Sequence, residues 1–188
     1  MLKKFKARVK KIIPDFRIDE PARTLVFQNH RIQIRNETYF MTRAVVPDIP
    51  ELLEIEKAVY DGKSPWSAKI FEGEICQKGR TLYLVLRKED KMLGFIGCST
   101  DAITGDVHIT NIAVLPECQG RGMGNFLVTA ITKRARLMKF KTVSLEVRRD
   151  NQAALNLYHQ LGFNKVGIQE NYYVEDGQDA VDMLLKLR

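Results

Sequence analysis

Three alternating glycines, Gly120, Gly122 and Gly124, form the stretch of this sequence with the clearest chemical meaning. They follow the strand-like run 107–114 and precede a helix-like segment with an apolar stripe. Glycine lets backbone N–H groups approach a ligand closely, and a helix N-terminus adds unpaired N–H groups and partial positive charge. Arg121 adds a full charge. The pattern therefore predicts a loop that binds a phosphate or a diphosphate.

Two other phosphate-binding loops differ from this one in spacing. A Walker loop ends in Gly-Lys-Ser/Thr, whereas Gly124 is followed by Asn125 and Phe126. The dinucleotide fingerprint Gly-x-Gly-x-x-Gly directly follows its strand, with an acid about 20 residues further on. Glu146 has that position, but the glycines here are spaced Gly-x-Gly-x-Gly and are separated from the strand by residues 115–119. Both departures weaken the dinucleotide interpretation.

The segments around this loop alternate between strand and helix patterns, which predicts a mixed α/β sheet in one layered domain. Strands are expected at 39–46, 81–87, 92–99, 107–114, 142–148, 163–169 and 181–187. Helices are expected from Pro47-Asp48, from Ser67 to about Gln77, over 125–138 and over 152–161.

The composition excludes several classes of protein. The chain has 188 residues, 45% apolar and 28% charged, which indicates a globular domain rather than a disordered or fibrous chain. No apolar run reaches the roughly 18 residues of a membrane span, and no apolar block follows the charged start as in a secretory signal. Three scattered cysteines exclude a disulfide framework and a Cys-x-x-Cys metal site. These features predict a cytoplasmic protein without a metal centre.

The formal net charge of +7 is concentrated at the N-terminus. Residues 1–14 contain six basic residues and no acid, whereas residues 41–188 carry only +1. This short basic amphipathic segment is consistent with contact to ribosomal RNA or an anionic membrane surface, or with a solvated terminus. The strand-like runs 24–27 and 31–34 predict a hairpin. We therefore expect a basic extension with a hairpin over residues 1–40 and the main domain over residues 41–188.

The motifs around the glycines resemble those of the Gcn5-related N-acetyltransferase (GNAT) family. The runs 111–116 and 119–124 are similar to the acetyl-CoA signature of that family, and 145–148, 151–158 and 161–163 to its second half. Three further pieces narrow the resemblance to the RimI type, the ribosomal-protein-alanine N-acetyltransferases: Pro65-Trp66-Ser67, Asn171-Tyr172-Tyr173 and Asp179-Ala180. The resemblance covers about residues 41–188 and does not explain residues 1–40.

The resemblance implies a GNAT fold in which two central strands, 107–114 and 142–148, splay apart around the co-substrate acetyl-CoA. Backbone groups of Ile112 and Val114 would bind the acetyl and pantetheine parts, and the glycine loop would hold the diphosphate. The implied cofactor-binding residues are Ile112, Ala113, Val114, Gly120, Arg121, Gly122, Met123, Gly124, Asn125 and Asn151.

Acetyl transfer to an amine requires a base for the ammonium proton, stabilisation of the developing oxyanion and an acid for the departing thiolate. The resemblance assigns the base to Glu146 and the acid to Tyr158. Both residue types suit these roles, since a partly buried carboxylate gains basicity and a phenol with a pKa of about 10 can protonate a thiolate. His108 on the strand 107–114 is an alternative base, and alternation along the strand predicts that it shares a face with Thr110 and Ile112.

The chemistry of amines also bears on the acceptor. At neutral pH a protein α-amine is roughly 300-fold more often neutral than a lysine amine, because its pKa is lower. A single carboxylate base is therefore better matched to a protein N-terminus, and the resemblance implies the N-terminal alanine of a small-subunit ribosomal protein. Trp66, Glu56 and Tyr172 are expected to line the acceptor groove, by resemblance and by residue type.

Two alternatives remain open at this stage. The first keeps acetyl-CoA and changes the acceptor to lysine or a small-molecule amine. The second is a non-catalytic module with the acetyl-CoA fold, which binds the ribosome or RNA through its basic N-terminus. The presence of both Glu146 and Tyr158 argues against the second alternative.

Overall fold

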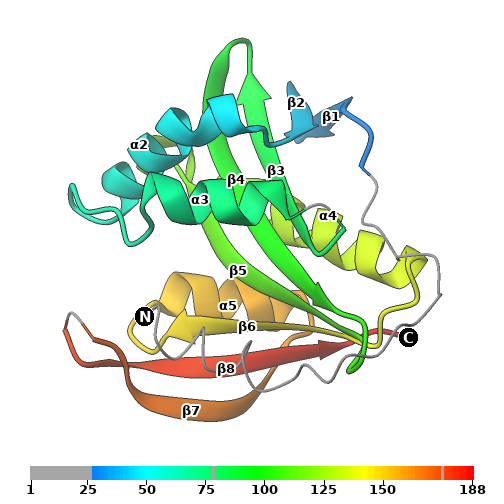
Figure 1. Cartoon of the computed structure of the whole chain (residues 1–188), viewed down its shortest axis with the longest axis vertical. Helices are drawn as coiled ribbons and strands as arrows, with labels where there is room; N and C mark the ends of the chain where they lie inside the picture. Colours follow the sequence, from blue (N-terminus) through cyan, green and yellow to red (C-terminus); the bar gives the residue numbers. More distant parts are fainter. Residues whose placement is uncertain (1–26, 78, 175) are drawn as a thin grey trace.

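A computed structural model describes residues 27–77, 79–174 and 176–188 (Figure 1). Its strands form one eight-stranded mixed sheet in the order β1-β2-β3-β4-β5-β6-β8-β7. The strands are β1 (His30–Ile34), β2 (Glu37–Arg43), β3 (Thr81–Lys88), β4 (Lys91–Asp101), β5 (Asp106–Val114), β6 (Thr142–Arg148), β7 (Asn164–Tyr173) and β8 (Gln178–Lys186). The helices are α2 (Ile49–Val59), α3 (Ala68–Cys76), α4 (Met123–Leu137) and α5 (Gln152–Gln160), with 3-10 turns η1 (Val46–Asp48) and η2 (Pro116–Cys118).

Strands β3 and β4 form the centre of the hydrophobic core. Each has a nearly continuous run of buried side chains instead of alternating buried and exposed positions. Such runs are found where both faces of a sheet are covered. Figure 1 shows α2 and α3 in front of these strands and α4 behind them. The α/β class and the order of elements expected from the sequence are confirmed.

The two neighbouring parallel strands, β5 and β6, separate soon after they begin. They pair only at Asp106–Thr142, Val107–Val143 and His108–Ser144, although β5 continues to Val114 and β6 to Arg148. Strand β6 instead pairs along its whole length with β8. Figure 1 shows β5 and β6 diverging from their common end. The predicted splay of the central strands is therefore present, and backbone groups of β5 that face the gap do not pair with β6.

One extra residue on β5 changes which side chains share a face. The adjacent residues Gly97 and Cys98 of β4 pair with Asn111 and Ile109, so that Thr110 has no partner of its own on β4. Such a bulge reverses the alternation of faces beyond it. The sequence predicts a common face for His108 and Ile112, and this prediction is wrong because the extra residue lies between them.

The N-terminal hairpin differs from the one expected. Residues 31–34 form a strand, but its partner is β2, and the turn is at Arg35 and Asn36. The other expected strand, 24–27, lies outside the described residues apart from Phe27, which is not in a strand, and the basic segment 1–14 lies wholly outside them. Because β2 pairs with β3, the hairpin belongs to the same sheet as the rest of the fold.

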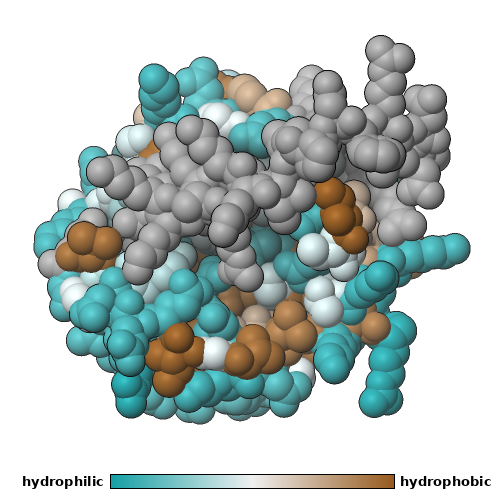
Figure 2. Space-filling view, turned by 60° about the horizontal axis from the view of Figure 1, so that its bottom comes forward, coloured by the Kyte–Doolittle hydropathy of each residue, from teal (hydrophilic) through white to brown (hydrophobic). Residues whose placement is uncertain are grey.

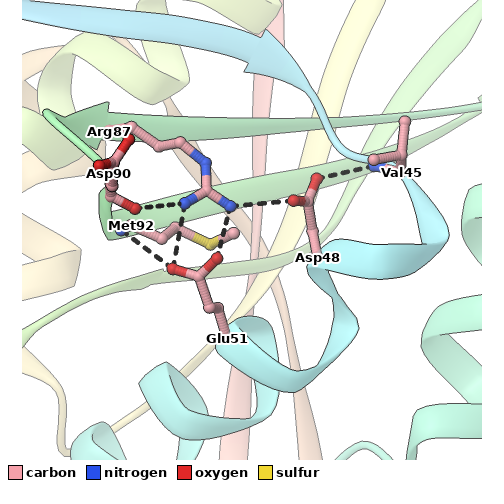
Figure 3. A network of polar contacts seen from close by, with 6 residues as sticks. All are labelled: Val45, Asp48, Glu51, Arg87, Asp90 and Met92. Carbon is pink, nitrogen blue, oxygen red and sulfur yellow. Dashed lines mark hydrogen bonds and ion pairs between the residues drawn. The ribbon is translucent and has the colours of Figure 1, made fainter.

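A polar network joins the start of α2 to the β3–β4 hairpin (Figure 3). The Arg87 guanidinium donates to both carboxylate oxygens of Glu51, at 2.6 and 3.1 Å, to Asp48 at 2.9 Å and to the Asp90 carbonyl at 2.8 Å. The Met92 N–H also donates to Glu51. The Arg87 side chain is only 17% exposed, so these bonds are partly shielded from water. The network fixes α2, whose residues reach the candidate site, onto the sheet.

We expect Arg87→Met to lower the free energy of unfolding by about 2 kcal/mol at pH 7, because two carboxylates lose a charged donor. For a chain of this length the melting temperature should fall by about 4–8 °C. Arg87 lowers the pKa of Glu51 below its ordinary value of 4.5 through hydrogen bonding. This contribution is therefore present above pH 4.5 and is lost as the pH falls through the lowered pKa, so the two melting curves should converge in acid.

Thermal unfolding followed by circular dichroism between pH 7 and pH 3 measures both effects. Lys88→Met is the matched control, because Lys88 pairs with Glu37 at the surface, where their side chains are 46% and 49% exposed. Such exposed pairs contribute little, so the control should melt close to the unchanged protein. Equal losses in the two variants would show that the Arg87 network adds nothing specific.

The outer strand β7 carries exposed apolar side chains. Val166 is 60% exposed and Ile168 41% exposed. Figure 2, which brings the lower side of Figure 1 forward, shows hydrophobic side chains interspersed with hydrophilic ones. A surface hollow of about 510 Å³ at the start of β7 and the end of β8 contains none of the predicted site residues. In the part of the chain that the structure describes, no helix is long and apolar enough to cross a membrane.

Candidate active site

The glycine loop connects the end of β5 to the start of α4. Gly120 and Gly122 have φ values of +71° and +90°, in the region that side chains other than glycine rarely adopt. Within the described part of the chain, none of the N–H groups of residues 120–125 donates a hydrogen bond to a protein acceptor. Consecutive free donors at a helix N-terminus suit a diphosphate. The loop therefore has the geometry that the sequence predicts for an anion site, and the bound diphosphate itself stays a prediction.

Two polar side chains near the loop have structural contacts. Gln119 donates from Nε2 to the Val114 carbonyl at 3.0 Å, which leaves that carbonyl less available to pantetheine. Asn151 is the N-cap of α5, and its Oδ1 accepts from the Ala154 N–H at 3.0 Å. The predicted cofactor contact of Asn151 would thus have to come from its side-chain amide or its backbone.

A chain of hydrogen bonds crosses from β5 to β6 at the last pair before the strands separate. The Ser144 hydroxyl donates to Asp106 Oδ2 at 2.5 Å, and Ser144 Oγ lies 2.9 Å from His108 Nδ1. On the other side of the ring, His108 Nε2 lies 3.0 Å from Glu146 Oε2. A hydroxyl has one proton, so with Asp106 ionised Ser144 accepts from His108 Nδ1. On the neutral ring Nε2 is then the acceptor nitrogen, and it faces Glu146.

Glu146, the predicted base, lies beside the gap between β5 and β6, and its role as the base stays a prediction. It is two residues beyond the last β5–β6 pair, and its side chain is 13% exposed. The structure brings the two candidate bases, Glu146 and His108, into direct contact, although they are 38 residues apart in the sequence. They form one contact pair beside the gap between β5 and β6.

Tyr158 lies on α5, the helix that follows β6. Its side chain is 5% exposed and its ring packs against Phe163, with centroids 5.7 Å apart. Burial raises its pKa above the ordinary value, and the nearby Tyr60 raises it further. The phenol therefore stays protonated at neutral pH and is a weaker acid than an ordinary phenol. Its role as the acid stays a prediction.

Sequence reasoning missed several groups around Glu146 and Tyr158. Tyr60, at the end of α2, interacts electrostatically with Tyr158 and with Tyr173 on β7. The charge of Glu146 raises the pKa of Tyr173, although burial is the larger cause. Arg148 stacks on the Tyr173 ring, with its Cζ 5.0 Å from the centroid. Arg148 shares the alternate face of β6 with Glu146, which the period of two could have shown, whereas no motif marks Tyr60.

Glu56, one of the three predicted acceptor residues, is buried, at 1% exposure. Its carboxylate accepts from the Ser64 hydroxyl at 2.5 Å, the Trp66 N–H at 3.1 Å and the Asn111 amide at 2.7 Å. Burial raises its pKa, while these three bonds oppose that shift. Glu56 thus ties the loop after α2 to β5 at the bulge, a position from which it orients the loop.

The other two predicted acceptor residues lie on different elements. The Trp66 ring packs against Phe71, with centroids 5.4 Å apart, and is half-buried beside the core. Tyr172 lies on β7, and its ring meets that of Tyr173 edge to face at 5.1 Å. Glu56 and Trp66 are therefore in contact. Tyr172 is linked to this region only indirectly, because its ring contacts Tyr173, which in turn interacts electrostatically with Tyr60. Their role in acceptor binding remains a prediction.

Comparison with known proteins agrees with this geometry. Residues 48–163 match the model of the acetyltransferase (GNAT) family. The [ribosomal protein bS18]-alanine N-acetyltransferase of Salmonella typhimurium is 36% identical over 142 residues, 74% of this chain and 92% of that protein. The N-alpha-acetyltransferase RimI of Mycobacterium tuberculosis is 35% identical over 147 residues, 76% of this chain and 87% of that one. The crystal structure of the Escherichia coli ribosomal-protein-S18-alanine N-acetyltransferase superposes with a TM-score of 0.71 at 32% identity, covering 79% of this chain and 94% of that one.

The chain therefore belongs to the GNAT family of acetyltransferases. It is an acetyl-CoA-dependent N-acetyltransferase, similar over about three quarters of its length to the enzymes that modify ribosomal protein bS18. The resemblance found in the sequence and the splayed sheet it implies are confirmed.

Proposed function

We propose that this enzyme transfers the acetyl group of acetyl-CoA to the N-terminal α-amine of a protein, with the alanine of a ribosomal bS18-type protein as the acceptor. The observation that carries the proposal is Glu146, held by His108 at the mouth of the gap between β5 and β6. The names of the relatives supply the acceptor class, and the lower pKa of an α-amine supports it chemically.

The roles of the chain's own groups follow from their positions. The N–H groups of residues 120–125 and the Arg121 charge hold the diphosphate. The backbone groups of Ile112 and Val114 that face the gap, where β5 no longer pairs with β6, hold the acyl arm. Acetyl-CoA supplies the activated acyl group. Glu146 takes the proton of the attacking ammonium, and the nitrogen then bonds to the acetyl carbon. As the carbon–sulfur bond breaks, Tyr158 gives its proton to the thiolate. The nitrogen, now bonded to the acetyl carbon, loses its second proton to the Tyr158 phenolate, and CoA and the acetylated N-terminus leave.

Acceptor competition tests this function. Three acceptors should be compared: a peptide with a free N-terminal alanine, a peptide with a blocked N-terminus and an internal lysine, and spermidine. The two peptides should otherwise have the same sequence. We expect the free alanine N-terminus to be acetylated at least about 100-fold faster in kcat/KM, from the greater neutral fraction of the α-amine. Mass spectrometry of the products locates the acetyl group. Faster turnover of the lysine peptide or of spermidine would establish the alternative acceptor class.

A further inference from the structure

The turn of the N-terminal hairpin touches the glycine loop. Arg35 donates from Nη2 to the carbonyl of Gly120 at 3.0 Å, across 85 residues of sequence. Arg35 itself has a φ of +54°, a conformation uncommon for a residue with a side chain. The hairpin precedes the region matched by the family model, which begins at residue 48. The contact is thus a feature of this chain that the family match does not include.

Apolar packing supports the same contact. Ile34 is buried, at 8% exposure, although it lies on the outermost strand. A Cβ atom added at Gly122 would lie 3.5 Å from Ile34 Cγ2, so the side chain rests directly against the loop. A hollow of about 210 Å³ is lined by residues 34–37 and Tyr39 of the hairpin and by Arg121 of the loop. The hairpin therefore supports the glycine loop through one apolar contact, from Ile34, and one hydrogen bond, from Arg35.

The hydrogen bond constrains a donor of the loop. In a trans peptide unit the C=O and the following N–H point in opposite directions. The Gly120 carbonyl faces Arg35, so the N–H of Arg121, in the same peptide unit, points away from the hairpin. That N–H is one of the free donors described above. If the Gly120 carbonyl lost its bond to Arg35, the Gly120–Arg121 peptide unit, which lies between two glycines, could rotate. The Arg121 N–H would then no longer point toward the ligand.

We propose that the N-terminal hairpin is part of the coenzyme site and that Arg35 is a positioning residue, which holds the glycine loop in the conformation that binds the CoA diphosphate. The inference rests on the proposed function in placing CoA at this loop. Arg35 acts through the Gly120–Arg121 peptide unit rather than by contact with the coenzyme.

Arg35→Gly tests the proposal in the full chain, since glycine accepts the positive φ without strain. Calorimetry should show CoA binding about fivefold more weakly, the effect expected for one hydrogen bond. KM for acetyl-CoA should rise by the same factor, while kcat and KM for the peptide stay within twofold. Arg35→Lys should recover part of the loss, because it restores a charged donor. Arg31→Gln, an exposed arginine of the same hairpin, is the control and should leave CoA binding unchanged.

Dephospho-CoA, which lacks the 3′-phosphate but keeps the diphosphate, separates positioning of the loop from direct contact with the 3′-phosphate. We expect Arg35→Gly to weaken CoA and dephospho-CoA equally. A loss confined to CoA would show that Arg35 contacts the 3′-phosphate and would overturn the positioning role. Unchanged affinity in Arg35→Gly, with CoA binding by the parent protein intact, would refute this inference alone. Failure of the parent protein to bind CoA would instead refute the proposed function.

Discussion

Glu146→Gln should lower kcat/KM for an N-terminal alanine peptide by about 100- to 1000-fold, the range that general acid–base groups contribute. Glutamine keeps the size and can donate its amide N–H to His108 Nε2, but it cannot take a proton. CoA binding should be unchanged, because the loop of residues 120–125 is separate from this side chain. Thiol release from acetyl-CoA measures turnover, and calorimetry measures CoA binding.

The pH dependence gives this experiment a second readout. As the pH rises past the pKa of the peptide α-amine, about 8, the amine loses its proton without a base. The deficit of Glu146→Gln should therefore shrink at high pH. Glu54→Gln is the matched control, because Glu54 is exposed on α2. Turnover of Glu146→Gln equal to that of this control at neutral pH would remove Glu146 from the mechanism.

Tyr158→Phe should lower kcat by about 100-fold, since the departing thiolate then lacks its acid. The KM for acetyl-CoA should change less than twofold. The fold should be preserved because the ring and its contact with Phe163 remain, and the hydroxyl makes no hydrogen bond to the residues that the structure describes. Steady-state kinetics and thermal unfolding of the same preparation measure both quantities.

The alternative for Tyr158 is ordinary core packing, as its burial allows. Packing alone predicts full activity in Tyr158→Phe and a loss of stability in Tyr158→Ala, where the ring is removed. Tyr158→Ala should unfold more easily in either case, because deleting a buried aromatic side chain costs about 3–5 kcal/mol. Only the phenylalanine variant therefore distinguishes the roles, and wild-type-like kcat there would contradict the acid assignment.

Most elements were predictable because their signals are local. Strand β6 has the expected bounds, since buried Val143, Leu145 and Val147 alternate with partly exposed neighbours. The hairpin turn was missed because Arg35 takes a positive φ that the sequence would assign to glycine or asparagine. The bulge at Thr110 was also missed, because an extra residue is defined only relative to the partner strand.

The sequence by itself determined the family, the glycine loop that is expected to bind a diphosphate, and the types of residue that could serve as base and acid. These depend on glycine conformation, residue chemistry and spacing along one or two elements. Only the tertiary structure decided which of the distant groups meet. It pairs His108 with Glu146, directs Glu56 to Asn111 and sets Arg35 against Gly120. Such contacts depend on strand order, on register and on where β5 leaves β6, and these are fixed by the packing of the whole sheet.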